Sequence, residues 1–179
     1  MIGYKIAVGV DENIGFFPVI VELEIPEDAK VVKPNVGQPL LNPLNDEYVH
    51  VSKYRTDKCT VKALDPLFGG IPRDWDTNAK ALSLWELMDY ISYGTKCVLH
   101  TVYKVGAEIT LDAISESVYD ECGTGIHFFD DKETARNYYF YDSSRWIKSY
   151  IDNYNSRLGR QTYHYSEIPM DDFKCLLSL

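Results

Sequence analysis

Alternating apolar and polar positions near the start of the chain predict two β-strands. The first covers Tyr4–Val10 and the second covers Phe17–Ile25, because successive side chains on a strand point to opposite faces. On the second strand, one face carries Val19, Val21, Leu23 and Ile25, and the other carries Ile20, Glu22 and Glu24. A polar turn that ends at Gly15 joins the two strands, so we expect an N-terminal β-hairpin.

Further strands are predicted where alternation or a short apolar run recurs. They cover residues 48–54, 59–64, 97–105 and 162–168, and a turn is predicted at Ile109–Leu111. Two long loops are predicted at 34–46 and 65–78, and loops of this length in a compact domain are often functional. Trp75 in the second loop either anchors the loop or offers a stacking surface to a ligand.

Apolar residues at helical spacing predict two longer helices, at 79–93 and 143–158, each followed by a glycine. A shorter helix is predicted after Asp130 or Asp131, with Ala135 and Tyr138 on its apolar side. The fold class expected from this pattern is α+β, with a mainly antiparallel sheet and two or three helices on one side. No domain boundary is evident, so residues 1–179 are predicted to form a single domain, with 141–179 as a C-terminal helix and strand extension.

A compact motif at residues 122–138 combines a glycine turn, a short apolar strand and the shorter helix. Gly123 and Gly125 flank Thr124, and this spacing indicates a tight turn or a close approach of the backbone to another group. One interpretation is a structural corner. The other is that the turn borders a ligand site, where Cys122, His127 or backbone N–H groups face a small molecule.

Composition and charge exclude several classes of function. The chain has 179 residues, a net charge of −9 and no basic cluster, which disfavours generic binding to nucleic acid or to an anionic membrane. No apolar run is long enough to span a membrane, and the first residues lack the form of a signal peptide. Four widely spaced cysteines and four histidines show no metal-ligand spacing, so neither a metal nor a cofactor is expected. The fourteen tyrosines suit binding surfaces.

Several segments resemble an uncharacterised domain family of large DNA viruses and phages, sometimes found beside pentapeptide repeats. The matching segments span residues 1–140 and are Glu22–Lys30, Lys58-Cys59 with Ala63, Tyr103–Gly106, and Cys122–Phe129 with Ala135 and Tyr138. The family usually has Arg after the Lys-Cys pair, whereas Thr60 stands here. The resemblance implies a viral or phage protein in the host cytoplasm or the virion, and it brings no catalytic residues.

The segment Gly123–Phe128 with Ala135 and Tyr138 also looks like the G-x-G-I-Y-F…A-x-x-Y segment of ADP-ribosyltransferases. In that fold, such a strand and helix line the nicotinamide pocket. The likeness implies that an early residue, here Tyr4 or Lys5, and a late Glu167 would join His127 in one cleft. His127 replaces the usual Tyr of that segment.

Two functions follow as hypotheses. The first is a non-catalytic, intracellular binding protein that holds a small nucleotide-like ligand or a protein partner. The alternative is an ADP-ribosyltransferase-like or other nucleotide-handling or NAD-handling enzyme, and a thiol enzyme built on Cys122 and His127 is a remote third. No catalytic residues are assigned. The candidate ligand-binding residues are Tyr4, Lys5, Trp75, Tyr103, Gly123, Thr124, Gly125, His127 and Tyr138.

Overall fold

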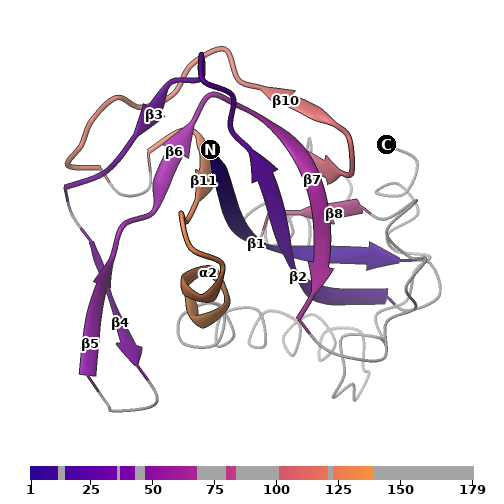
Figure 1. Cartoon of the computed structure of the whole chain (residues 1–179), viewed down its shortest axis with the longest axis horizontal. Helices are drawn as coiled ribbons and strands as arrows, with labels where there is room; N and C mark the ends of the chain where they lie inside the picture. Colours follow the sequence, from indigo (N-terminus) through magenta and orange to yellow (C-terminus); the bar gives the residue numbers. More distant parts are fainter. Residues whose placement is uncertain are drawn as a thin grey trace, which may run out of the picture.

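The computed structural model describes residues 1–11, 15–35, 37–42, 47–67, 80–83, 101–120 and 123–138. These residues form three antiparallel sheets and one α-helix (Figure 1). The N-terminal hairpin of β1 (Ile2–Asp11) and β2 (Gly15–Glu24) lies at the centre, paired from Ile2 with Glu24 to Asp11 with Gly15. The hairpin predicted from the alternating pattern is therefore present.

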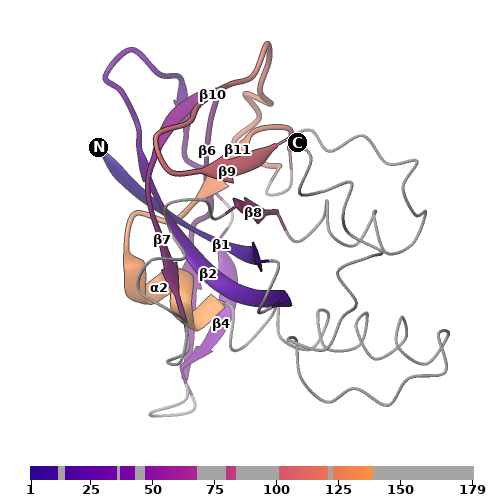
Figure 2. The same ribbon diagram turned by 90° about the vertical axis from the view of Figure 1, so that its right-hand side faces the viewer.

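The largest sheet has six strands and curls on itself. Its order is β10-β7-β2-β1-β8-β9. The outer strands are β7 (Lys58–Pro66), β8 (Lys80–Leu82), β9 (Val102–Lys104) and β10 (Glu108–Thr110). The two edge strands, β9 and β10, are consecutive in the chain, so the sheet must bend to bring its edges together (Figure 2). Gly106, with φ at 83°, makes the turn between them and donates its N–H to the carbonyl of Val61 on β7 over 2.8 Å.

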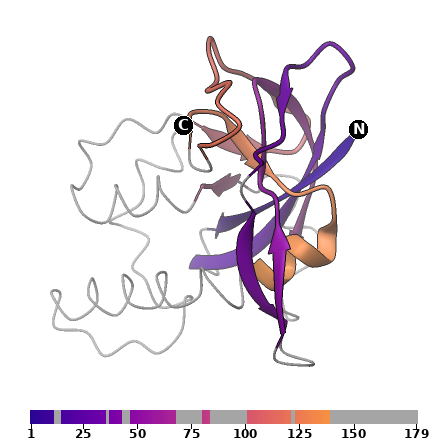
Figure 3. The same ribbon diagram turned by 90° about the vertical axis from the view of Figure 1, so that its left-hand side faces the viewer.

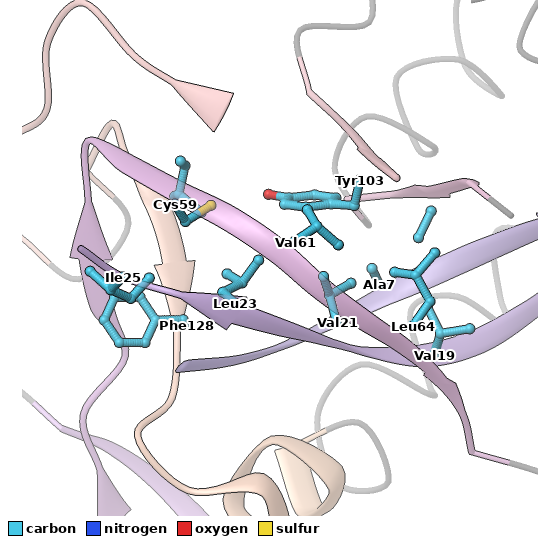
Figure 4. Packing of buried hydrophobic residues seen from close by; sticks show 12 residues of the cluster. Ala7, Val19, Val21, Leu23, Ile25, Cys59, Val61, Leu64, Tyr103 and Phe128 are labelled. Carbon is cyan, nitrogen blue, oxygen red and sulfur yellow. The ribbon is translucent and has the colours of Figure 1, made fainter. Parts of the chain in front are cut away.

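A second sheet of three short strands contacts β1 near its N-terminal end. Its order is β11-β6-β3, with β3 at Val31–Val32, β6 at Tyr54–Thr56 and β11 at Ile126–Phe128. Tyr4 and Phe129 exchange two backbone hydrogen bonds of 2.8 and 2.7 Å, and this bridge joins the second sheet to the first. The side chains of Ile126 and Phe128 enter the same core as Val21, Leu23 and Val61 (Figure 4).

The inner face of the six-stranded sheet is the main core. Residues directly opposite each other on antiparallel strands share a face, so Ala7, Val19, Val21, Leu23 and Val61 all point inward. Each of these five side chains is almost completely buried. Burial of a large aliphatic side chain stabilises a fold by roughly 1.5–3 kcal/mol, so this cluster holds the curled sheet together.

The helix α2 (Lys132–Tyr138) covers the opposite face of β1 and β2. Ala135 is fully buried there, and the ring of Tyr138 lies 5.1 Å from the ring of Phe129, between centroids. Asp131 begins the helix by accepting a 2.6 Å hydrogen bond from the backbone N–H of Thr134. The remaining strands, β4 (Gln38–Asn42) and β5 (Glu47–Val51), form a hairpin that extends away from the six-stranded sheet (Figures 1 and 3).

The expected α+β class with two or three helices is wrong. The described residues are mostly antiparallel strand, and α2 is the one helix among them. The helix predicted from residue 79 is contradicted at its start, because Lys80–Leu82 forms the strand β8 between β1 and β9. Ala81 and Leu82 are both buried, on opposite faces, and an apolar run of this kind does not distinguish a helix from a strand.

Two smaller expectations also fail. Residues 108–110 form the strand β10 where a turn was predicted at Ile109–Leu111, and β4 occupies part of the predicted loop 34–46. The predicted helix at 143–158, the strand at 162–168 and most of the helix at 79–93 lie outside the described residues. The single domain 1–179 with its C-terminal extension stays a prediction. In the part of the chain that the structure describes, no helix has the length and apolar character needed to cross a membrane.

Candidate ligand-binding site

Lys5 places a charged side chain on the inner face of the curled sheet. It lies opposite Val21 in the β1–β2 register, and its neighbours on the same face of β1 are Gly3 and Ala7. The side chain is half-buried. An ammonium group at such a position must find polar partners, because transferring a charge out of water is costly.

Two partners of Lys5 among the described residues come from distant parts of the chain. Its Nζ atom donates a hydrogen bond of 3.5 Å to the backbone carbonyl of His127 on β11. The same atom lies 5.8 Å from the centroid of the Tyr103 ring on β9, within the range of a cation–π interaction. We call Lys5, Tyr103 and His127 the inner-face cluster. Three positions predicted separately from the sequence thus come close together. His127 contributes its backbone carbonyl, whereas its side chain extends from the face of β11 opposite to that of Ile126 and Phe128.

Cys59 lies beside the inner-face cluster. In Figure 4 the Tyr103 ring packs by Val61, with its hydroxyl on the side of Cys59. Burial raises the pKa of the Cys59 thiol to about 11, although the positive charge of Lys5 acts in the opposite direction. At neutral pH the side chain is a protonated thiol, which is a poor nucleophile and a poor metal ligand.

Tyr4 and Tyr138 lie on the other side of the sheet. Tyr4 neighbours Lys5 in β1, so its side chain points to the opposite face, the face that α2 covers. Tyr138 on α2 packs against Phe129, and the Nζ atom of Lys53 lies 5.6 Å from its ring centroid. These two tyrosines therefore do not join the inner-face cluster. Trp75 lies outside the described residues.

The glycine turn before β11 is closely packed by protein atoms. A β-carbon at Gly123 would lie 2.5 Å from the Cβ atom of Ser115 and 2.7 Å from a carboxylate oxygen of Asp120. A β-carbon at Gly125, where φ is 151°, would lie 3.0 Å from the Cβ atom of Arg55. Thr124 between them is exposed, and its carbonyl accepts a 2.8 Å hydrogen bond from the N–H of Ser115. Both glycines thus permit a close approach of protein segments.

Arg55 on β6 is not among the candidate residues predicted from the sequence. Its side chain is completely buried, and its guanidinium group donates hydrogen bonds to the backbone carbonyls of Ser115, Ser117 and Asp120. The one available signal was its place between Tyr54 and Thr56 in a short alternating segment, and the predicted strand 48–54 ended just before it. A fully buried arginine is rare unless its donors are satisfied. We therefore expect Arg55 to have a specific role in this structure.

The described residues hold no group of three His, Cys, Asp or Glu side chains that could bind a metal ion. The hypothesis of a thiol enzyme at Cys122 and the late Glu167 of the ADP-ribosyltransferase likeness both concern residues outside the described part of the chain. The described residues place the ammonium group of Lys5 close to the ring of Tyr103 and to the backbone carbonyl of His127. Such a set can bind a small anion and orient an attached ring.

The described part of the protein is thus a curled antiparallel sheet with a half-buried lysine on its inner face. A family model matches residues 1–135, and the chain belongs to that family, a family of unknown function (DUF5758). Searches of curated proteins and of solved structures found no match to the chain.

Proposed function

We propose that this protein is a non-catalytic binding protein that holds a small anionic, nucleotide-like ligand at the inner-face cluster. The observation that carries the proposal is the position of Lys5, whose ammonium group lies on a largely apolar face between the Tyr103 ring and the His127 carbonyl. The viral or phage setting implied by the sequence resemblance belongs to the same proposal.

The chemistry of the cluster supports a phosphate or carboxylate as the group that Lys5 binds. A lysine ammonium donates up to three hydrogen bonds, and those to an ionised acceptor are roughly twice as strong as neutral ones. Low polarity around Lys5, from Ala7, Val21 and Leu23, strengthens its attraction for an anion. The strand of His127 would then contact the remainder of the ligand, and the buried Tyr103 ring would support Lys5 from below.

The raised pKa of the Cys59 thiol supports binding over thiol catalysis at this place. The alternative of an ADP-ribosyltransferase-like enzyme draws on one observation, the hydrogen bond from Lys5 to the backbone carbonyl of His127, because that likeness needs an early residue close to the His127 strand. The two proposals differ in whether NAD is consumed. Release of nicotinamide from NAD by the full chain, measured by chromatography, would favour the enzyme and overturn the non-catalytic proposal.

The direct test is a thermal-shift and calorimetric screen of the full chain. The probes are nucleoside mono- and diphosphates, cyclic nucleotides, NAD and inorganic phosphate, with adenosine as a probe without a phosphate. A ligand at 100 times its Kd adds about 2.7 kcal/mol to the free energy of unfolding, which raises Tm by several degrees. We expect a shift with the phosphorylated compounds and none with adenosine.

The matched variants are Lys5→Met and Lys62→Met. Lys62 lies on β7, is exposed, and forms a 3.0 Å surface ion pair with Glu24, so its replacement removes the same charge away from the cluster. A hydrogen bond to a charged group contributes about 1.5–3 kcal/mol, so Lys5→Met should weaken binding by roughly 10- to 150-fold, and Lys62→Met should leave it unchanged. Equal losses in both variants would indicate nonspecific attraction. No shift with any probe would favour a protein partner.

A further inference from the structure

Arg55 directs a buried positive charge towards backbone carbonyls of a segment without regular secondary structure. The residue lies in the middle strand of the second sheet, directly opposite His127 on β11 and Val32 on β3. Residues directly opposite each other share a face, so the Arg55 and His127 side chains extend from the same face of this sheet. The side chain of Arg55 is completely buried.

The acceptors of Arg55 all belong to residues 115–120, which we call the strap. The Nε atom donates to the Ser115 carbonyl over 3.2 Å, and the two terminal nitrogens donate to the carbonyls of Ser117 and Asp120. The strap has no regular secondary structure, so its carbonyls need partners from elsewhere. Among the described residues no carboxylate forms an ion pair with Arg55. The rigid fork of the guanidinium group is therefore used to fix backbone geometry.

The strap is in turn connected to β11. The N–H of Ser115 donates to the carbonyl of Thr124 over 2.8 Å, and Gly123 packs against Ser115 and Asp120. Gly125 packs against Arg55 itself. Arg55 thus holds both the strap and the turn through which the chain enters β11. The next residues, Ile126 and His127, begin that strand.

We infer that Arg55 is a positioning residue for the inner-face cluster: by clamping the strap and the glycine turn, it sets the place of the His127 carbonyl and hence of the Lys5 ammonium group. The path consists of contacts that follow one another in space, from Arg55 to the strap, to Thr124, to β11, and to Lys5. This inference rests on the proposed function for its effect on binding. The clamp itself does not depend on any ligand.

The test combines hydrogen exchange with ligand binding in the full chain. The variants are Arg55→Met, Arg55→Lys and, as a matched control, Arg136→Met, which removes the same charge from an exposed position on α2. We expect Arg55→Met to increase deuterium uptake in peptides covering 115–126 and to leave the peptides of β1 and β2 protected. Arg55→Lys keeps the charge but loses the fork, so it should increase uptake as well. Arg136→Met should change neither region.

The binding readout uses adenosine 5′-monophosphate and NAD at a temperature well below every Tm. Residues that act through others typically change affinity by about two- to thirtyfold, so we expect Arg55→Met to weaken Kd roughly tenfold while Lys5 is intact. Unchanged uptake at 115–126 in Arg55→Met would overturn the clamp. Increased uptake with an unchanged Kd would overturn the positioning role, because the clamp would then serve stability alone.

The two proposals fail in different ways. If the unaltered chain binds neither probe, the proposed function fails at that point and uptake at 115–126 alone decides whether Arg55 is a clamp. If Arg55→Met does not fold, Gly125→Ala replaces it, because the added methyl group would press on Arg55 and loosen the same turn without removing the charge. Protection of 115–126 in a folded Gly125→Ala variant that equals that of the unaltered chain would overturn the clamp.

Discussion

The ring of Phe128 lies directly over Gly3. A β-carbon at position 3 would lie closest to the Cδ2 atom of Phe128, 2.9 Å from its Cγ atom and 3.0 Å from its Cε2 atom, and real β-carbons essentially never come within 3.0 Å of another such atom. Phe128 is fully buried, and its ring stacks on Tyr54 with 5.4 Å between centroids. This contact is where the three-stranded sheet meets the first strand of the six-stranded sheet, so glycine at position 3 permits the two sheets to share one core.

We expect Gly3→Ala to destabilise the protein by about 1–3 kcal/mol, because overpacking forces a core side chain away from its preferred position. The measurement is the free energy of unfolding from urea denaturation. Gly106→Ala is the control, since Gly106 has φ at 83° and no atom within 4 Å of an added β-carbon, so it reports backbone strain alone. Phe128→Leu should reduce the cost of Gly3→Ala, and strictly additive effects of the two substitutions would contradict the contact.

Because of Cys59, we expect the free energy of unfolding to decrease at alkaline pH. Burial raises the pKa of its thiol from 9.0 to about 11 in the folded protein. The folded state therefore binds the proton more tightly than the unfolded state does, so this contribution to stability is complete below pH 9 and is lost as the pH rises towards 11. We expect the free energy of unfolding to fall over that range and to fall less in Cys59→Ala. Equal pH dependence in both proteins would contradict the raised pKa.

The same burial predicts slow labelling of Cys59. At pH 8 the native thiol should react with a maleimide far more slowly than the same thiol in denaturant, because the thiolate is the reactive form. Mass spectrometry of the labelled peptides separates Cys59 from Cys97, Cys122 and Cys175. Equal labelling rates of Cys59 in the native and denatured chain would show that this thiol is neither buried nor held protonated.

Asp131 is the capping residue of α2. Its carboxylate accepts a hydrogen bond from the backbone N–H of Thr134. Hydrogen bonds from the side chain of Thr134 and from its backbone hold the pKa of Asp131 below its usual value of 3.8. We expect Asp131→Ala to cost about 0.5–2 kcal/mol and Asp131→Asn to cost much less, since Asn also caps helices well. Because the folded pKa is lowered, the contribution of the charged form is present above about pH 4 and is lost as the pH falls. A loss in Asp131→Asn equal to that in Asp131→Ala would contradict the cap.

Lys5 should contribute little to stability. A charge at a half-buried position on an apolar face gains less from its surroundings than a hydrophobic side chain of similar size does, and binding residues often lower stability. We expect Lys5→Met to leave the free energy of unfolding unchanged or to raise it by up to about 1 kcal/mol. Urea denaturation without ligand measures this. A loss of more than about 1 kcal/mol would show that Lys5 is retained for structure, which would weaken the proposed binding role.

Local patterns along the chain were enough to predict several elements. The N-terminal hairpin follows from the alternation that puts Val19, Val21 and Leu23 on one face, and β11 and α2 follow from the short apolar run with the capping aspartates after it. The same alternation separates Tyr4 from Lys5, because neighbours on a strand cannot share a face. These features depend on residues close together in sequence, where the spacing of two residues determines whether their side chains point to the same face.

Only the tertiary structure decided the class of the fold and the composition of the site. Lys80–Leu82 forms a strand because β1 and β9 pair with it on either side, and a pattern that is apolar on both faces contains no information about those partners. Tyr103 and His127 both lie about a hundred residues or more after Lys5. The curl of the six-stranded sheet brings Tyr103 towards Lys5, and the bridge between Tyr4 and Phe129 brings β11 there. Arg55 acquires its role from carbonyls of a segment 60 residues away, and a carbonyl is the same in every residue. The sequence therefore does not indicate which carbonyls accept the hydrogen bonds of Arg55.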